Sequence, residues 1–239
     1  MMGATLTGRT VLVIGRGSGI ARAVTLTLHT AGATVVVAGR NPAELASAYD
    51  EQDIAVQRID LTDETSVAAL AERLGRVDHV VSTASARARG TVDALDHDVI
   101  LASFNVKVLG PMLLAKHFAP RMPADGSFVL FSGSSARKPA IGMLAVGATN
   151  AAVDAVTRGL AVELAPIRVN AISPGTIDTG AYDALGDEAK ARLFATRSTT
   201  SPARRIGTPD DVAGAVVFAM TTPFLTGVSL AIDGGEPLV

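Results

Sequence analysis

"TVLVIGRGSGIARAV", residues 10–24, decides the fold of this chain. Its apolar, β-branched run (10–15) predicts a buried strand, and the glycines after it predict a tight turn into a helix near Ile20. Glycines at such a turn let the backbone approach a pyrophosphate, and the free N–H groups of the helix N-terminus favour an anion. The pattern is Gly15-x-x-x-Gly19 and not G-x-G-x-x-G, because Ile20 stands where a third glycine would fall. A plain tight turn stays the alternative interpretation.

Apolar runs alternate with segments of helical period along the whole chain. Runs that are apolar throughout indicate strands covered on both faces, as in a parallel sheet. We therefore expect an α/β fold, a single doubly wound Rossmann-type domain over residues 1–239 with a seven-stranded parallel sheet flanked by helices. A polar stretch, 179–211, interrupts the last alternation and predicts a lid over a site. The expected strands are 10–15, 34–39, 54–59, 79–84, 127–132, 167–173 and 228–233, and the expected helices are about 20–30, 42–49, 62–75, 98–119 and 143–164.

The composition excludes several kinds of site and partner. The chain has 239 residues, 48% hydrophobic and 18% charged, which is typical of one globular domain. The absence of cysteine excludes disulfides, thiolate metal sites and a cysteine nucleophile, and the four histidines lack metal-ligand spacing, so we expect no metal. A net charge of −2 argues against a nucleic-acid partner. The N-terminal apolar run is too short for a signal peptide or a membrane span, so we expect a cytoplasmic protein with no membrane partner.

The end of the second expected strand predicts the cofactor. A carboxylate there would bind the ribose 2′-hydroxyl of NAD, but the sequence has Gly39 and Arg40. A guanidinium pairs well with a 2′-phosphate, and Arg16 in the glycine turn adds a second positive charge, so we expect NADP(H) in preference to NAD(H). The alternative is that Arg40 is a solvated loop arginine. Arg87 and Arg89, after the fourth expected strand, are interpreted as solvated, with a contact to substrate or cofactor phosphate as the alternative.

These residues resemble the short-chain dehydrogenase/reductase family over nearly the whole chain. The family's glycine pattern falls on residues 14–21, its Asn-Asn-Ala-Gly motif on "STAS" (82–85), its helix asparagine on Asn105, and its Pro-Gly-x-x-x-Thr motif on "PGTIDT" (174–179). The resemblance implies an oxidoreductase in which Ile177 and Thr179 hold the nicotinamide carboxamide. The resemblance and the two arginines expected at the 2′-phosphate, Arg16 and Arg40, give one set of cofactor-binding residues. They are Gly15, Arg16, Ser18, Gly19, Ile20, Arg40, Asp60, Leu61, Thr83, Ala84, Ser85, Pro174, Gly175, Ile177 and Thr179.

The resemblance breaks down at the catalytic centre. The family's tyrosine and lysine stand one helical turn apart, where the lysine lowers the pKa of the phenol that exchanges a proton with the substrate. The register of "NAAVDAV" puts Val146 at the tyrosine position and Asn150 at the lysine position. The serine position falls on Gly133, or on Ser134 after a shift of one residue. Neither of the chain's two tyrosines is followed by a lysine four residues later, so the family's usual mechanism cannot operate unchanged.

Polar side chains near the expected site offer replacements for the missing phenol. Lys138 could act as an acid or bind an anionic substrate, and Ser134 could donate to a carbonyl oxygen. Asn150 could hold the nicotinamide ribose, and Asn105 could order a water molecule. Lys138 as a surface charge and Asn150 as a packing residue stay open as alternatives. The candidate catalytic residues are therefore Asn105, Ser134, Lys138 and Asn150.

Three hypotheses about function follow from these patterns. The first, which we favour, is an NADP(H)-dependent oxidoreductase with an altered proton donor that acts on a small carbonyl, enone or imine. The second is an inactive cofactor-binding member that serves as a sensor or as the partner of an active subunit. The third is a non-redox lyase, isomerase or cyclase that uses a cleft made drier by Val146. The small residues of the helix at 143–164 permit close helix approach, so a homodimer or homotetramer is expected.

Overall fold

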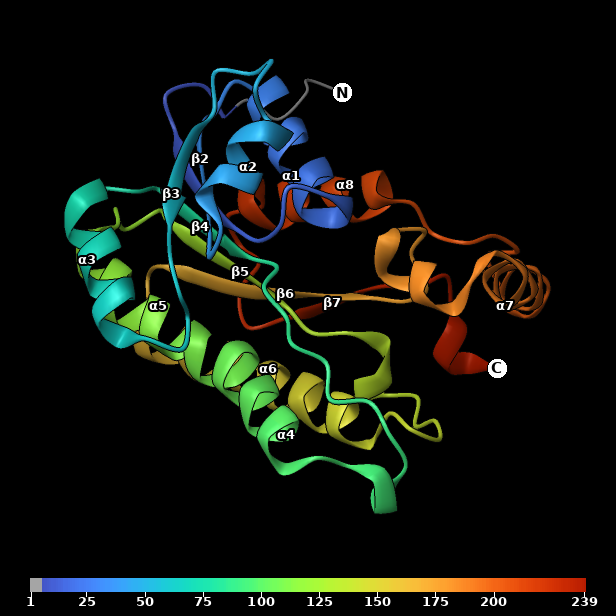
Figure 1. The fold of residues 1–239 in the computed structure, drawn as a ribbon. Helices are drawn as coiled ribbons and strands as arrows, with labels where there is room; N and C mark the ends of the chain where they lie inside the picture. Colours follow the sequence, from blue (N-terminus) through green and yellow to red (C-terminus); the bar gives the residue numbers. More distant parts are fainter. Residues whose placement is uncertain (1–5) are drawn as a thin grey trace.

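The computed structural model describes residues 6–239 and arranges them around one parallel sheet (Figure 1). Its seven strands stand in the order β3-β2-β1-β4-β5-β6-β7, so the order reverses between β1 and β4. The doubly wound, seven-stranded parallel sheet expected from the sequence is confirmed. The strands are β1 (Thr10–Ile14), β2 (Thr34–Gly39), β3 (Ala55–Arg58), β4 (His79–Ser82), β5 (Ser127–Phe131), β6 (Arg168–Pro174) and β7 (Ser229–Ile232).

Helices cover both faces of the sheet, which explains why its central strands are apolar on both sides (Figure 1). On one face, α1 and α8 pack with α2 against side chains such as Val13 and Val37. On the other, α3, α5 and α6 pack against side chains such as Leu12 and Val80. The helices of these two layers are α1 (Gly19–Thr30), α2 (Pro42–Ala48), α3 (Glu64–Leu74), α4 (His97–Phe104), α5 (Gly110–Phe118), α6 (Leu144–Glu163) and α8 (Pro209–Thr221).

The expected helix at about 98–119 is present but is not a uniform α-helix. A π-helical turn, η2 (Asn105–Leu109), joins α4 to α5, and the continuous helix runs over His97–Arg121. This helix is long and apolar enough to cross a membrane by length and composition alone, with a mean hydropathy of 1.5. Since the same helix contributes Leu114, Ala115 and Phe118 to the core beneath the sheet, that test is weak evidence for a membrane span.

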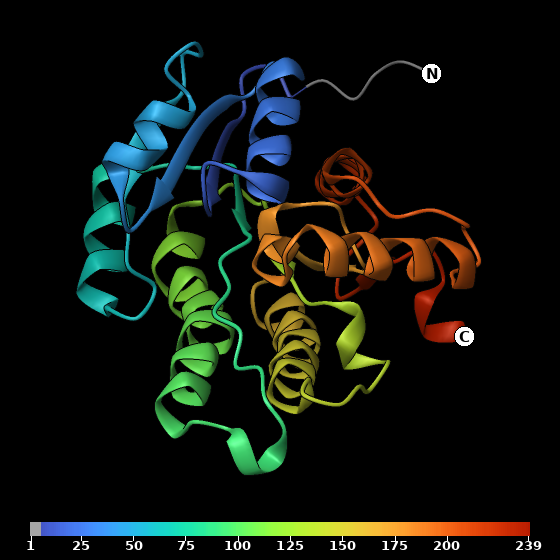
Figure 2. The same cartoon turned by 45° about the vertical axis from the view of Figure 1, so that its right-hand side comes forward.

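The polar stretch 179–211 contains more regular structure than its composition suggests. It holds a short 3-10 segment, η5 (Gly180–Leu185), the helix α7 (Asp187–Thr200) and the start of α8. Neither α7 nor α8 is among the helices expected from the sequence. No residue of α7 is buried, and Figure 2 shows the helix at the outer edge of the molecule, near the C-terminal end of the chain. The lid over a site that the stretch predicts stays a prediction.

Candidate active site

The glycine turn meets the end of β4 where the strand order reverses. Both the main-chain N–H and the hydroxyl of Thr83 donate to the carbonyl oxygen of Ile14, at 2.9 and 3.0 Å. A Cβ on Gly15 would overlap the Thr83 hydroxyl, so only glycine fits at this position. The crevice at the carboxyl ends of the strands beside such a reversal is where open α/β sheets bind ligands. Thr83, Ala84 and Ser85, expected to line the cofactor cleft, all follow β4 at this edge.

The N-terminus of α1 presents unsatisfied N–H groups at the same edge. Its N-cap, Ser18, makes no capping hydrogen bond with its side chain, which leaves the first helical N–H groups available to a phosphate. Gly19 adopts φ +56°, and a Cβ there would come within 3.3 Å of the Thr179 side chain. The structure thus brings together Gly19 of the glycine turn and Thr179 of the Pro-Gly loop, two residues that are far apart in the sequence.

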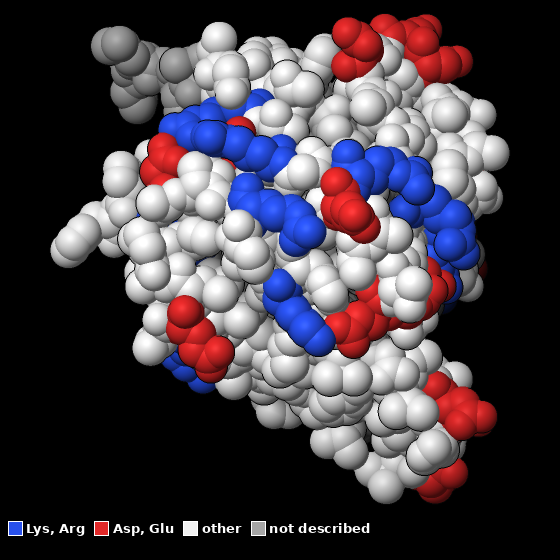
Figure 3. All heavy atoms as spheres, turned by 90° about the vertical axis from the view of Figure 1, so that its left-hand side faces the viewer, with Lys and Arg blue, Asp and Glu red and all other residues white. Residues whose placement is uncertain are grey.

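Two arginines in the loops that follow β1 and β2, Arg16 and Arg40, have no protein partners among the described residues. Within residues 6–239, neither Arg16 nor Arg40 makes a side-chain hydrogen bond or an ion pair, and both are exposed. Asp60, which follows β3, has a lowered pKa because its carboxylate accepts from the main chain and hydroxyl of Thr62, and Arg40 adds a favourable charge. On the side of the molecule that carries α3 and β3, Figure 3 shows Lys and Arg side chains gathered in bands across the face. Two unpaired guanidinium groups near the end of β2 suit a phosphate ligand.

Several other expected cofactor residues are buried or closely packed near the carboxyl ends of the strands. Ile177 is buried, and its main chain pairs with Gly207. A Cβ on Gly175 would lie 2.7 Å from the Cα of Asp233. Ile20 packs against the core on the α1 side, Leu61 is buried in the core on the other face, and Pro174 ends β6. These contacts position the loops, and the ligand contacts of the same residues stay predictions.

A buried hydrogen-bond network surrounds Asn150, at the position where the resemblance implies a lysine. The Asn150 side chain accepts a hydrogen bond from Nζ of Lys107 at its Oδ1, and its Nδ2 donates to the Ser135 hydroxyl at 2.7 Å. The Lys107 ammonium also donates to the carbonyl oxygen of Ser132, at 3.3 Å, and the Ser132 hydroxyl donates to the main chain of Asn150, at 3.0 Å. A cation from the π turn is therefore fixed beside α6 at the end of β5, although Asn150 itself carries no charge.

The surroundings of Lys107 make its ammonium group acidic for a lysine. Only 8% of the residue is exposed. Desolvation and, to a smaller extent, the charge of Arg87 together lower its pKa from 10.5 to about 7, while Asp154 on α6 opposes the shift. Asp154 has a buried carboxylate oxygen with no hydrogen-bond partner in the described part of the chain. A lysine with a pKa near neutrality, fixed by hydrogen bonds, has the properties of a general acid or base.

The residue at the expected serine position is glycine for a steric reason. A Cβ on Gly133 would come within 2.7 Å of Nδ2 of Asn150, so the amide occupies the space that a side chain would need. The hydroxyl that bonds Asn150 belongs to Ser135 and not to Ser134, whose side chain makes no hydrogen bond in the described part of the chain. Val146 is buried on α6, one turn before Asn150. The wall that would carry the phenol is therefore apolar.

The remaining candidates, Lys138 and Asn105, lie outside this network. Nζ of Lys138 donates to the carbonyl oxygen of Glu236 at 2.7 Å, and to Val239. The neighbouring Arg137 forms an ion pair with Asp233 at 2.7 Å. These contacts tie the loop after β5 to the last residues of the chain, and the catalytic role expected for Lys138 stays a prediction. Asn105 begins the π turn, and its side chain makes no hydrogen bond to any residue in 6–239.

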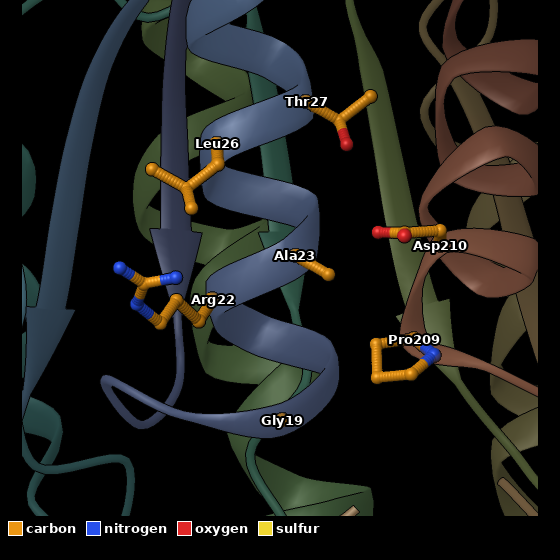
Figure 4. Close-up of a pocket in the computed structure, with 7 residues that line it drawn as sticks. All are labelled: Gly19, Arg22, Ala23, Leu26, Thr27, Pro209 and Asp210. Carbon is orange, nitrogen blue, oxygen red and sulfur yellow. The ribbon is translucent and has the colours of Figure 1, made fainter. Parts of the chain in front are cut away.

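Lys107 is the residue that the sequence analysis missed. Two features of the sequence could have indicated Lys107: the chain has only four lysines, and this one stands two residues after Asn105. Among residues 6–239 no group of three or more His, Cys, Asp and Glu side chains could hold a metal ion. A separate pocket of about 290 Å³ lies between α1 and α8. Figure 4 shows Asp210 pointing toward α1 while Arg22 points away from α8, so this pocket brings no reactive groups together.

Comparison with known proteins agrees with this geometry. The profile of the family described as "Enoyl-(Acyl carrier protein) reductase" matches residues 14–236. The chain is 32% identical to the short-chain dehydrogenase/reductase malC of Malbranchea aurantiaca, over 96% of this chain and 95% of that one. It is 31% identical to the 7alpha-hydroxysteroid dehydrogenase of Escherichia coli K12, over 96% and 94%. This chain belongs to the short-chain dehydrogenase/reductase family.

Two solved structures extend the likeness to the fold. The structure of the MalC Reductase/Diels-Alderase superposes with a TM-score of 0.90 at 30% identity, covering 98% of each chain. A small-chain dehydrogenase in complex with NADPH superposes with a TM-score of 0.84 at 30% identity, covering 97% of this chain and 99% of that one. The short-chain dehydrogenase/reductase assignment therefore rests on both sequence and structure, and it identifies the chain as a member of an oxidoreductase family.

Proposed function

We propose that the protein is an NADP(H)-dependent reductase in which Lys107 protonates the oxygen of a small carbonyl substrate. The observation that carries the proposal is the buried Lys107 ammonium held by Asn150 and the main chain of Ser132. An ammonium group has three donors, and these two hydrogen bonds use two of them. The third donor remains for a substrate oxygen. The family's lysine on α6 is replaced by Asn150, and the Lys107 amine reaches this asparagine from the neighbouring helix.

The cofactor fits the residues at the crevice. Gly15 leaves room for close backbone approach, and the free N–H groups of α1 suit the pyrophosphate. Arg16 and Arg40 are unpaired cations placed for a 2′-phosphate, which supports NADP(H) over NAD(H). A structural relative carries NADPH. When bound, the reduced nicotinamide supplies the hydride that the substrate carbon receives.

The side chains of this protein then deal with the substrate oxygen. The Ser135 hydroxyl accepts a hydrogen bond from Asn150, so its own proton is free to point to that oxygen. As negative charge develops on the oxygen, Lys107 releases a proton from Nζ and is left as a neutral amine, which solvent reprotonates. The positive charges of Lys107 and Arg87 favour an oxyanion and repel a protonated imine. We therefore place ketones and enones ahead of imines.

Replacement of Lys107 by methionine tests the proposal. NADPH oxidation would be measured with a panel of ketones and enones, and NADPH and NADH binding by fluorescence. We expect the Lys107→Met variant to lose about 10²–10⁴-fold in kcat while its affinity for NADPH stays within a few-fold of wild type. Lys116→Met, which removes an exposed lysine from the same continuous helix, is the matched control and should keep full activity.

The two other hypotheses give different outcomes in the same assays. NADPH binding without turnover of any substrate would favour an inactive sensor or partner subunit. A second candidate function is a cyclisation, because a relative is named a Reductase/Diels-Alderase and the wall at Val146 is apolar and buried. Product formation without NADPH oxidation would identify that reaction.

The cytoplasmic location stays a prediction.

We also propose that the protein forms a homodimer or homotetramer through α5 and α6. A groove of about 820 Å³ runs between these helices, and the apolar Met112 that lines it is 41% exposed. Gly159 and other small residues of α6 permit close helix approach. Light scattering that gives the mass of a monomer would contradict this assembly.

A further inference from the structure

Arg87 extends from a stretch of backbone that is held on both sides. It lies between β4 and α4, in the segment that follows the cleft residues Thr83 and Ala84. Before it, the Ser103 hydroxyl donates to the carbonyl oxygen of Ala86 at 2.7 Å. After it, the N–H of Gly90 donates to the carbonyl oxygen of Gly142 at 3.1 Å. The side chain of Arg87 therefore starts from a fixed point at the carboxyl edge of the sheet.

The charged groups that act on Arg87 include two arginines and no carboxylate. Its guanidinium makes no hydrogen bond or ion pair with any residue in 6–239. Desolvation by the surrounding protein lowers its pKa, Arg89 and Arg16 lower it further, and only Tyr182 opposes the shift. The side chain is nevertheless more than a third exposed, so a ligand can reach it. Cations placed together without a carboxylate repel one another, and an anion from outside the chain would relieve that repulsion.

The neighbours of Arg87 indicate which anion this is. Arg16 lies toward the glycine turn, where the cofactor phosphates are expected. Lys107, whose pKa Arg87 lowers, belongs to the proton-donating network. Tyr182 lies in η5, within the stretch expected to form a lid. The charge of Arg87 therefore acts both on Arg16, expected at the cofactor phosphates, and on Lys107, expected at the reacting carbonyl. Since Arg16 and Arg40 already supply charges for the phosphates, Arg87 is left for the substrate.

We propose that Arg87 binds a carboxylate on the substrate, so that the protein reduces small oxo acids. This inference rests on the proposed function for the position of the reacting carbonyl. A planar guanidinium binds a carboxylate through two parallel hydrogen bonds, which fixes both the position and the orientation of the molecule. The carboxylate would hold one end of the substrate while Lys107 and Ser135 hold the carbonyl oxygen.

The test compares free acids with their methyl esters. The probes are straight-chain 2-oxo, 4-oxo and 5-oxo acids and the methyl ester of each, assayed with NADPH and with wild type, Arg87→Gln and Arg89→Gln. We expect wild type to prefer the acid of the best pair. We expect Arg87→Gln to lower kcat/KM for that acid by roughly 10–100-fold more than for its ester, and to leave the NADPH affinity within about threefold. Arg89→Gln is the matched control and should change the acid-to-ester ratio by less than about threefold.

The remaining outcomes separate this inference from the proposed function. Turnover of esters and acids alike, with a ratio that Arg87→Gln does not change, overturns the carboxylate site and leaves the reductase standing. Loss of NADPH affinity in Arg87→Gln also overturns it, because Arg87 would then be a cofactor contact. If no probe is reduced, calorimetric titration of the same oxo acids into the protein with NADP⁺ tests whether the carboxylate site exists. Binding that Arg87→Gln abolishes upholds the carboxylate site without the reductase, and absence of binding to wild type overturns it.

Discussion

At the scale of single residues, the titration of Lys107 should control the pH dependence of the reaction. Burial and Arg87 lower its pKa to about 7, against the opposing charge of Asp154. A lowered pKa means that the ammonium, the form that gives a proton, is lost as the pH rises through 7. We expect kcat for reduction to be level below pH 6 and to fall about tenfold per unit well above pH 7. Alcohol oxidation, which needs the neutral amine, should rise over the same range.

The comparison that isolates Lys107 is the Lys107→Arg variant, because a guanidinium stays protonated at these pH values. Its residual activity should show no inflection near pH 7. A wild-type profile that is flat from pH 6 to 9, measured with the hydride-transfer step rate-limiting, would exclude Lys107 as the donor. Sequence reasoning could single out Asn150 but not its partner Lys107, because the π turn of Asn105–Leu109 changes which face of the helix each later residue occupies.

At the scale of elements, α8 depends on its first turn. The Thr208 hydroxyl accepts from the N–H of Asp211 at 3.3 Å, and Asp211 in turn accepts from the N–H of Thr208 at 2.8 Å, which is a capping box. We expect Thr208→Ala to lower the free energy of unfolding by about 1 kcal/mol in urea titrations. Thr196→Ala, at an exposed position within α7, should change it by less than about 0.5 kcal/mol. Equal effects of the two substitutions would contradict the importance of the cap.

The start of α8 was not predicted, although its sequence carries the usual signals of a helix N-terminus. Thr208-Pro209-Asp210-Asp211 carries the signals of a helix start, with a cap, a proline in the first turn and early acids. In the sequence these residues fall within the polar stretch 179–211, because the capping signals follow directly on a run of charged and polar side chains. The strands, by contrast, could be predicted closely, since an apolar, β-branched run between turns leaves few alternatives.

At the scale of the whole molecule, His79 should make stability fall in mild acid. It lies in the central strand β4, 4% exposed, with its Nδ1 2.8 Å from the Ser127 hydroxyl. Desolvation lowers its pKa from 6.5 to about 4, against the charge of Asp78, while Arg9 and Arg168 add to the lowering. Protonation therefore favours the unfolded chain, so stability that is complete above pH 6.5 is lost as the pH falls toward 4.

The size of this loss follows from the shift. A change from 6.5 to about 4 corresponds to about 3 kcal/mol at 1.36 kcal/mol per pKa unit. Urea unfolding of wild type and His79→Gln at pH 7 and pH 4 separates this group from carboxylates such as Asp78, whose titration both proteins share. Glutamine carries no charge to bury, so the variant should lose about 3 kcal/mol less than wild type between the two pH values. Equal losses would mean that His79 is hydrated in the folded state and that the sheet tolerates its charge.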